Sequence, residues 1–276
     1  MHHLRFFLLS GLLLLLMVGR QSAAATPRIV SLNGTISEII CALGRQPQLV
    51  GVDVTSTYPV SLAQLPRVGH NRNISAEGVL ALNPTLVVGT TESLKPEVAS
   101  QLKAAGIAVH LFRQEYSVAG TKQLIKEMAA TFGATAQVPA VLARLDADLT
   151  KVKRSATAPK VLFIYARGAG TLMVAGQGTS VEKMVHLAGA RNAATGFSDF
   201  KPLTAEALVA ANPDVLLLFD SGLQSLGGTA GLLQIPGVAQ TTAGRTGRII
   251  EMDGQLLTGF GPRLGQATAE LASKLK

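Results

Sequence analysis

The clearest helical pattern in the chain runs from residue 135 to residue 157. Apolar residues recur there at spacings of three and four, which places them along one face of a helix: Val138, Val141, Leu142, Leu145, Leu149 and Val152. Thr135 can cap the start, and Pro159 lies just beyond the end. At a rise of about 1.5 Å per residue, such a helix is a rod of roughly 30 Å. The pattern predicts one long helix that connects two parts of the chain.

The two flanks of this helix carry the same pattern. Residues 75–88 and residues 204–217 each read as a capped short helix, an Asn-Pro stop and a buried strand. Matching residues stand at equal offsets in the two segments, namely Glu77, Asn83 and Pro84 in one and Glu206, Asn212 and Pro213 in the other. Such a unit is common in α/β proteins, but the matching offsets favour a two-lobed pseudo-repeat.

Strand and helix patterns alternate on both sides of the long helix. In the N-terminal part we expect strands at 28–32, 48–53, 85–89 and 107–112, and helices at 35–43, 75–82, 94–105 and 117–132. In the C-terminal part we expect strands at 160–166, 214–219 and 247–251, helices at 179–188, 204–211 and 263–275, a loop at 167–178 and a turn at 227–231.

Helices that separate strands build parallel sheets. The sequence therefore predicts an α/β fold in which residues 26–134 and 158–276 form two lobes with mainly parallel central sheets. One long rigid helix, 135–157, joins them. Ligands of open α/β sheets bind beyond the carboxyl ends of the strands. The loops at 54–73, 167–178 and 220–228 are thus expected to line a ligand cleft between the lobes.

The first 25 residues have the features of a cleaved signal peptide. A basic start is followed by an apolar run from Phe6 to Val18, which is short for a membrane span, and by the small residues of 22–25. We expect cleavage after Ala25, or after Ala24. The only cysteine, Cys41, lies far from this region, so no lipid anchor is expected. The sequence predicts an exported protein in the periplasm of a two-membrane bacterium.

Composition narrows the classes of partner and of site. The formal net charge is +8, but the basic residues are scattered and aromatic residues make up only 4% of the chain, so a nucleic-acid surface is a poor fit. Ligands or partners that carry carboxylates fit better. A single cysteine excludes an intramolecular disulfide and a cysteine-based metal site. Cys41 lies in an apolar helix pattern and is expected to pack in the core.

Motifs for catalysis are missing from the sequence. The glycine-rich segment 168–178 lacks the spacing of a phosphate-binding loop, and no G-x-S-x-G elbow is present. His110 lies in a strand pattern and His186 in a helix pattern, where a structural histidine is common. Histidines scattered over both lobes also make a tetrahedral zinc site a poor fit. We therefore expect a binding protein and not an enzyme, with an exported hydrolase as a remote alternative.

A series of short motifs follows in a familiar order. They include Arg28-Ile-Val-Ser-Leu, Leu65-Pro66-x-Val68-Gly69-x-x-Arg72, Ala76-Glu77-Gly78, Ala175-Gly176-Gln177, Gly196-Phe197-Ser198 and Leu257-x-Gly259-Phe260-Gly261. With these motifs the chain resembles the periplasmic haem-binding proteins of haem-uptake ABC transporters. They belong to the helix-linked class of substrate-binding proteins, together with siderophore and cobalamin carriers. The resemblance covers nearly all of residues 27–276.

The resemblance implies haem b as the transported ligand, with two departures from the family pattern. Where the family usually has a tyrosine iron ligand, this chain has His70, and imidazole is itself a common haem-iron ligand. Where some members have a second ligand, a histidine, this chain has Arg167, which is suited to pairing with a propionate. We therefore expect His70 to ligate the iron and Arg72 to orient nearby groups. Weaker candidates for the site are Tyr58 and Tyr165, as a ring face or a sixth ligand, and Met173, as a packing contact.

The resemblance also implies the partners of a monomeric carrier: an inner-membrane ABC permease dimer and its ATPase. Glu77 and Glu206, one per lobe, would dock on that permease, although a glutamate in a first helical turn is also favoured by the helix dipole. A siderophore or cobalamin carrier is the alternative, and in it His70 would not bond iron. Whether the cleft holds one haem or two stacked haems is left open by the sequence.

Overall fold

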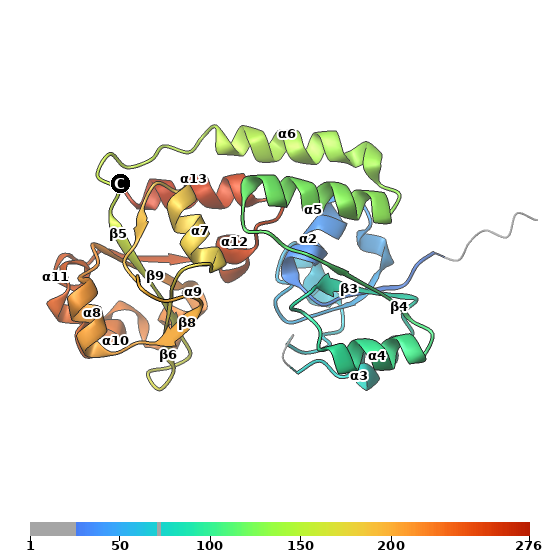
Figure 1. Ribbon diagram of the computed structural model, residues 1–276, viewed down its shortest axis with the longest axis horizontal. Coiled ribbons are helices and arrows are strands. Elements are labelled where there is room, and N and C mark those ends of the chain that lie inside the picture. The colour runs from blue at the N-terminus through green and yellow to red at the C-terminus, as the bar shows by residue number, and fades with distance from the viewer. Residues whose placement is uncertain (1–25, 71–72) are drawn as a thin grey trace, which may run out of the picture.

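The computed structural model describes residues 26–70 and 73–276, which form two lobes (Figure 1). The predicted signal peptide, 1–25, and Arg72 lie outside the described residues. Helix α6 (Val138–Leu149) lies along one side of the molecule, next to helix α5 (Val118–Thr131) of one lobe and helix α13 (Leu264–Lys274) of the other. Among the described residues, no helix combines the length and the apolar character needed to cross a membrane.

The first lobe is built on a parallel sheet with the strand order β2-β1-β3-β4. Every strand pair in it is parallel, as predicted from the alternating helices. Its strands are β1 (Ile29–Ser31), β2 (Leu49–Val52), β3 (Leu86–Thr90) and β4 (Ala108–Phe112). Besides α5, its helices are α2 (Gly34–Ala42), α3 (Ala76–Leu80) and α4 (Pro96–Ala104), with short 3₁₀ turns at Gln46–Gln48 and Val60–Gln64.

The second lobe is built on a mixed sheet with the order β10-β9-β5-β6-β8, in which β7 also pairs with β5. Its parallel strands are β5 (Lys160–Ala166), β7 (Arg191–Asn192), β9 (Val215–Phe219) and β10 (Ile249–Met252). The antiparallel strands are β6 (Leu172–Ala175) and β8 (Phe200–Pro202). Besides α13, the helices are α7 (Ser180–Leu187), α8 (Ala205–Ala211), α9 (Asp220–Ser225), α10 (Gly228–Leu233), α11 (Thr242–Thr246) and α12 (Gly254–Thr258).

Two segments of the second lobe differ from the sequence-based expectation. The segment 167–178 is not a continuous loop, because β6 forms within it and pairs with both β5 and β8. The short run of β6 is bounded by glycines and too brief to show a strand period. The expected turn at 227–231 is instead the start of α10. At this start Gly227 and Gly228 take positive φ values of +84° and +74°, which glycine adopts readily.

The predicted pseudo-repeat is confirmed in the geometry of the two lobes. Ser75 and Thr204 cap α3 and α8, accepting hydrogen bonds from Gly78 N at 3.1 Å and Ala207 N at 3.2 Å. The turn after each helix contains an asparagine with positive φ, Asn83 at +47° and Asn212 at +38°. The strand orders β2-β1-β3-β4 and β7-β5-β9-β10 then correspond, and β6 with β8 is an addition to the second lobe.

The linking helix is shorter than predicted. A 3₁₀ turn covers Thr135–Gln137, and α6 is a 12-residue helix that ends at Leu149. At about 1.5 Å per residue, α6 spans roughly 18 Å. Residues 152–159 form no helix. Because an extended chain covers more distance per residue than a helix does, this segment can span the remaining distance to β5. The predicted apolar stripe nevertheless packs on the core along its whole length, including Val152.

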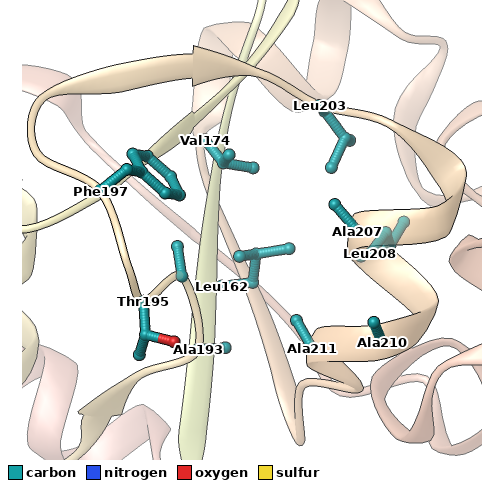
Figure 2. Close-up of a pocket in the computed structure, with 11 residues that line it drawn as sticks. Leu162, Val174, Ala193, Thr195, Phe197, Leu203, Ala207, Leu208, Ala210 and Ala211 are labelled. Carbon is teal, nitrogen blue, oxygen red and sulfur yellow. The ribbon is translucent and has the colours of Figure 1, made fainter.

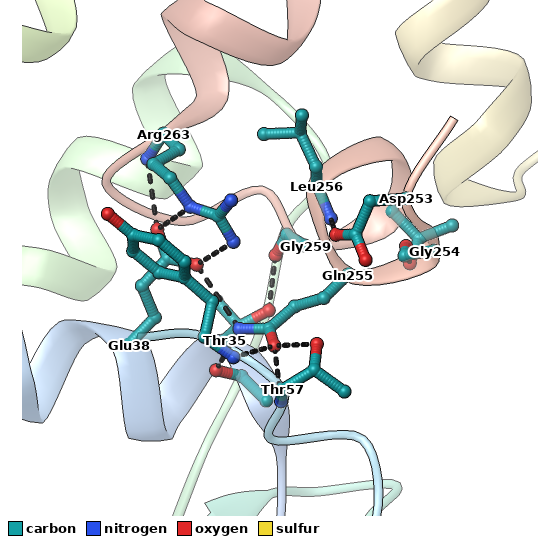
Figure 3. Close-up of polar contacts among 12 residues, drawn as sticks. Thr35, Glu38, Thr57, Asp253, Gly254, Gln255, Leu256, Gly259 and Arg263 are labelled. Atoms are coloured by element: carbon teal, nitrogen blue, oxygen red, sulfur yellow. Dashed lines mark hydrogen bonds and ion pairs between the residues drawn. The ribbon is translucent and has the colours of Figure 1, made fainter. Parts of the chain in front are cut away.

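The lobes are held together by apolar packing, in which the linking helix takes part, and by polar contacts. One apolar cluster includes side chains of both lobes, such as Ile36 of α2, Met128 of α5, Leu145 of α6, Met184 of α7 and Leu271 of α13. A polar network lies beside it, where the segment 253–263 of the second lobe meets α2 and the loop 55–58 of the first (Figure 3).

Two side chains carry this polar network. Gln255 Oε1 accepts hydrogen bonds from Thr57 N at 2.7 Å and Tyr58 N at 2.9 Å, while its Nε2 donates to Gly34 O at 2.9 Å. Arg263 donates two hydrogen bonds from its guanidinium to Glu38, at 3.1 and 2.9 Å. These contacts fix the relative placement of the lobes around the cleft.

Cys41 of α2 packs half-buried against the shared core, as predicted. Burial, with a smaller contribution from the Glu38 carboxylate, raises the pKa of its thiol to about 12. The thiolate is the reactive form, so the folded protein should react slowly with thiol reagents. At pH 8.5 we expect iodoacetamide to alkylate Cys41 at least about tenfold more slowly in the folded protein than in guanidinium. Equal rates, followed by mass spectrometry, would contradict this.

Candidate functional site

A cavity of about 820 Å³ lies between the lobes. This volume is in the range of small-molecule sites, about 300–1,000 Å³. Both lobes line it, and the lining comes from the ends of β5 and β9, the loop after β2 and the starts of α2, α7 and α12. The predicted loops 54–73 and 220–228 contribute to it, whereas the segment 167–178 contributes only through Arg167.

His70 lines the first-lobe side of this cavity and is half-buried. The loop that carries it runs alongside the end of β2, where Val68 N donates to Val52 O and Val54 N donates to Gly69 O, both at 3.0 Å. Gly69 takes a φ of +103°, which a side chain would disfavour. On the other side of His70, Asn73 N donates to the carbonyl of His70 at 2.7 Å. The backbone on both sides of the imidazole is thus fixed by hydrogen bonds.

Tyr165 and Arg167 line the opposite wall, at the end of β5. The Tyr165 ring packs edge-on against Phe219, with the centroids 6.1 Å apart. The Arg167 guanidinium carbon lies 5.8 Å from the centroid of the Tyr165 ring, within reach of a cation–π contact. The Arg167 backbone N donates to Thr171 O at 3.1 Å, which holds the turn that follows the strand. The structure therefore brings three of the predicted residues, His70, Tyr165 and Arg167, to one cavity.

Two other predicted residues lie outside this cavity lining. Met173 is the cross-strand partner of Tyr165 on β6, so it occupies the same face of the sheet without reaching the lining. Tyr58 borders a different cavity, of about 420 Å³, and its ring centroid lies 3.6 Å from the guanidinium carbon of Arg263. Arg72 lies outside the described residues.

The other two histidines of the described residues have structural contacts, as predicted. His110 of β4 stacks on Phe112 with the ring centroids 4.3 Å apart. His186 of α7 lies 3.0 Å from Glu182, one helical turn away. In the described part of the chain, histidine, cysteine and carboxylate side chains form no group of three or more that could hold a metal ion.

Several lining groups were missed by the reading of the sequence. The N-terminus of α2 opens on the cavity, with Asn33 Oδ1 capping Thr35 N at 2.8 Å and Ile36 N at 3.2 Å. The N-terminus of α7, at Ser180, also reaches the lining. Helix N-termini carry partial positive charge and favour a carboxylate nearby. Each helix follows directly on a polar cap, a signal that could have pointed to these positions.

The lining of the cavity also includes a neutral phenol and two carboxylates. Burial, with a smaller contribution from Glu92, raises the pKa of Tyr116. Its ring packs edge-on against Phe260, at a centroid distance of 5.4 Å. Asp253 caps α12 by accepting from Leu256 N at 2.7 Å, and Asp220 accepts from Ser221 N at 2.6 Å. Both carboxylates are thus engaged by backbone donors, which offsets their charge.

Glu77 and Glu206 occupy equivalent positions in the pseudo-repeat. Each lies exposed in the first turn of its helix, α3 or α8. The two helices belong to different lobes and lie on the side of the molecule away from α6 (Figure 1). A partner that spans both lobes on that side could contact both carboxylates.

Solved structures of two periplasmic haem-binding proteins are similar to this chain. RhuT from Roseiflexus sp. RS-1, solved in apo form, is 44% identical with a TM-score of 0.86, over 91% of this chain and 98% of that one. BhuT, solved in complex with two haems, is 39% identical with a TM-score of 0.84, over 90% of this chain and 97% of that one.

Curated sequences give more distant matches. The substrate-binding lipoprotein YvrC of Bacillus subtilis, described as an uncharacterized ABC transporter component, is 28% identical over 90% of this chain and 79% of its own length. A cobalamin-binding protein of Halobacterium salinarum is 28% identical over 89% of this chain and 68% of its own.

The profile of one family, described as periplasmic binding protein, matches residues 29–256. With two lobes around one cavity and a match over most of its length, the chain belongs to the periplasmic binding protein family.

Proposed function

We propose that this protein binds haem in the cavity between its lobes and carries it through the periplasm to an inner-membrane ABC permease with its ATPase. The observation that carries the proposal is the pair His70 and Tyr165, which face one cavity from opposite lobes, with Arg167 beside the tyrosine. The role is binding and delivery as a monomer, after export through a cleaved signal peptide, and not catalysis.

Iron ligation is assigned to His70, with Tyr165 as the candidate for the sixth position. The porphyrin nitrogens fill the equatorial positions, so a protein needs to supply only axial ligands, and both imidazole and tyrosinate serve in that role. Structures of the haem-binding protein HmuT, which is 31% identical in each case, include variants of a histidine, an arginine and a tyrosine. The tyrosine and the arginine of HmuT are two positions apart, as Tyr165 and Arg167 are here.

The propionates are assigned to the positive groups of the cavity. Arg167 can pair with a carboxylate through parallel hydrogen bonds. The N-termini of α2 and α7, at Asn33 and Ser180, add partial positive charge from either lobe. Arg72, placed by the sequence close to His70, remains a proposed orienting residue. Tyr58 and Met173 are left out of the proposed site because they do not line the cavity.

Cobalamin is the second candidate ligand, because curated relatives include cobalamin-binding proteins. Cobalamin brings axial ligands of its own to its cobalt in addition to the four corrin nitrogens, so two protein ligands from opposite walls are less expected for it than for haem. Hemin titration, followed by the Soret absorption and repeated with excess cyanocobalamin, separates the two. Haem transport requires saturable hemin binding that cobalamin does not displace. Displacement of hemin by cobalamin would overturn the proposal. The end point of the hemin titration also shows whether one haem or two bind per protein.

Docking on the permease is assigned to Glu77 and Glu206. Exposed carboxylates on two lobes suit a permease dimer that presents basic residues twice, and rim charges act mainly on association. We expect Glu77→Ala with Glu206→Ala to leave hemin binding unchanged and to reduce hemin transport into vesicles at least about tenfold. The loss of two exposed ion pairs at an interface supports a change of that size.

The control for this pair also removes one exposed glutamate from each lobe, but at other positions. Glu97 lies exposed in the first turn of α4, and Glu251 lies exposed on β10 of the second lobe. The variant Glu97→Ala with Glu251→Ala removes the same charge and should transport hemin normally. Equal transport by both double variants would leave Glu77 and Glu206 with only their helix-terminus role.

A further inference from the structure

An apolar groove of about 290 Å³ runs beside α8 in the second lobe (Figure 2). Its floor is formed by Leu162 of β5 and Val174 of β6, and Phe197 stands on the wall opposite α8. On the α8 side the lining consists of Ala207, Ala210 and Ala211 together with the buried Leu208. This groove is separate from the cavity between the lobes, with which it shares no lining residue.

The pseudo-repeat explains why this groove is open. The asparagine stops of the two lobes correspond, so the residue before each stop corresponds too: Leu82 in the first lobe and Ala211 in the second. In the first lobe Leu82 lies directly on β2, where a Cβ built on Gly51 would come within 2.3 Å of Leu82 Cδ1. Leu82 thereby fills the space between α3 and the sheet, as part of an apolar cluster.

In the second lobe alanines take part in lining the corresponding space. The chain leaving β7 continues beside β5, with Ala193 N donating to Val161 O at 2.8 Å, and both Ala193 and Ala194 line the groove. Ala211 is too short to reach across as Leu82 does. The groove therefore lies where the second lobe lacks the leucine of the first, and its volume of about 290 Å³ has room for more than one leucine side chain.

The rim of the groove carries charge on both sides. Glu206 precedes Ala210 by four residues on α8, which places both residues on the same face of the helix. Across the groove, the Lys201 amine lies 4.8 Å from the centroid of the Phe197 ring. An apolar side chain next to a basic residue on a partner would match this combination of groove and rim.

We propose that this groove receives one aliphatic or aromatic side chain of the permease, next to the permease cation that pairs with Glu206. The inference rests on the docking role proposed for Glu206 and adds an apolar anchor to it. Buried apolar anchors beside polar rims supply most of the binding energy at protein interfaces. In the first lobe Leu82 occupies the corresponding place, so the two lobes would dock unequally on a two-fold permease.

The test places a larger side chain of this protein in the groove. Ala211→Leu supplies the side chain that Leu82 supplies in the first lobe, and Ala211→Val is the milder form of the same change. Val209→Leu is the matched control, because Val209 lies on α8 but does not line the groove. The partner is the permease–ATPase complex, in proteoliposomes, that accepts hemin from the wild-type protein. Affinity of the hemin-loaded protein for this complex is measured, together with hemin titration and thermal unfolding.

We expect Ala211→Leu to bind hemin like the wild type, to keep or raise the unfolding temperature and to bind the permease about tenfold to a hundredfold more weakly. Val209→Leu should stay within about twofold of the wild type. An unchanged affinity of Ala211→Leu for the permease would contradict the proposed contact in the groove. If Ala211→Leu does not fold, the same criterion applies to Ala211→Val. If Glu77→Ala with Glu206→Ala weakens binding to the permease but Ala211→Leu does not, only the proposed groove contact is wrong. If neither variant changes the affinity for the permease, the proposed docking role of the glutamates is wrong as well.

Discussion

Replacing His70 with alanine is expected to weaken hemin binding at least about tenfold, or about 1.4 kcal/mol, and to shift the Soret band. Within the described residues, His70 is the one imidazole that lines the cavity, and the hydrogen bonds around Gly69 and Asn73 fix its backbone. Loss of an axial nitrogen ligand changes both the affinity and the electronic spectrum of haem. Affinity is measured by fluorescence quenching, and the spectrum by absorption at saturating hemin.

His186→Ala is the control for this variant. It removes an imidazole of the second lobe that contacts Glu182 on α7 and does not line the cavity. The control should match the wild type in affinity and in the position of the Soret band. A His70→Ala protein with the spectrum and affinity of the control would remove His70 from the site.

Replacing Glu38 with alanine is expected to lower the free energy of unfolding by about 3–5 kcal/mol. The Glu38 side chain is 6% exposed and that of Arg263 17%, so the variant leaves an almost buried guanidinium without its carboxylate. The same change removes a partner of Gln255 Nε2, at 3.2 Å, in the network between the lobes. Urea unfolding measures the change.

Glu270→Ala is the comparison for that experiment. Glu270 pairs with Lys274 at 3.8 Å on the surface of α13, with both side chains more than a third exposed. An exposed pair of this kind contributes at most about 1 kcal/mol. Equal losses in Glu38→Ala and Glu270→Ala would show that the contact between the lobes does not stabilise the fold.

We also expect the lobes to rotate little on hemin loading. A large change in the small-angle scattering profile between the free and the hemin-loaded protein would contradict this.

The elements that the sequence predicted best are those whose local chemistry decides the structure. Ser75 and Thr204 cap their helices as the pattern indicated, and the Asn-Pro stops at Asn83 and Asn212 take the same left-handed turn. The buried strand β5 begins and ends where expected. Caps, stops and apolar runs act over a few residues, so they can be read from the chain.

The errors arise where distant contacts decide the structure. Val152 continues the apolar stripe of α6, but it packs on the core from a non-helical segment because the chain must reach β5. Tyr58 and Tyr165 looked alike as candidates, yet the Tyr58 ring lies against the Arg263 guanidinium and borders a different cavity. The bridge made by Gln255 joins residues about two hundred positions apart, and no local pattern signals it.

A crystal structure of the protein with hemin tests the proposed site most directly. The expected result is iron in the cavity between the lobes, bonded to an imidazole nitrogen of His70, with Tyr165 on the opposite face and a propionate at Arg167. Hemin bound elsewhere, or held in this cavity with the His70 imidazole turned away from the iron, would contradict the proposed site.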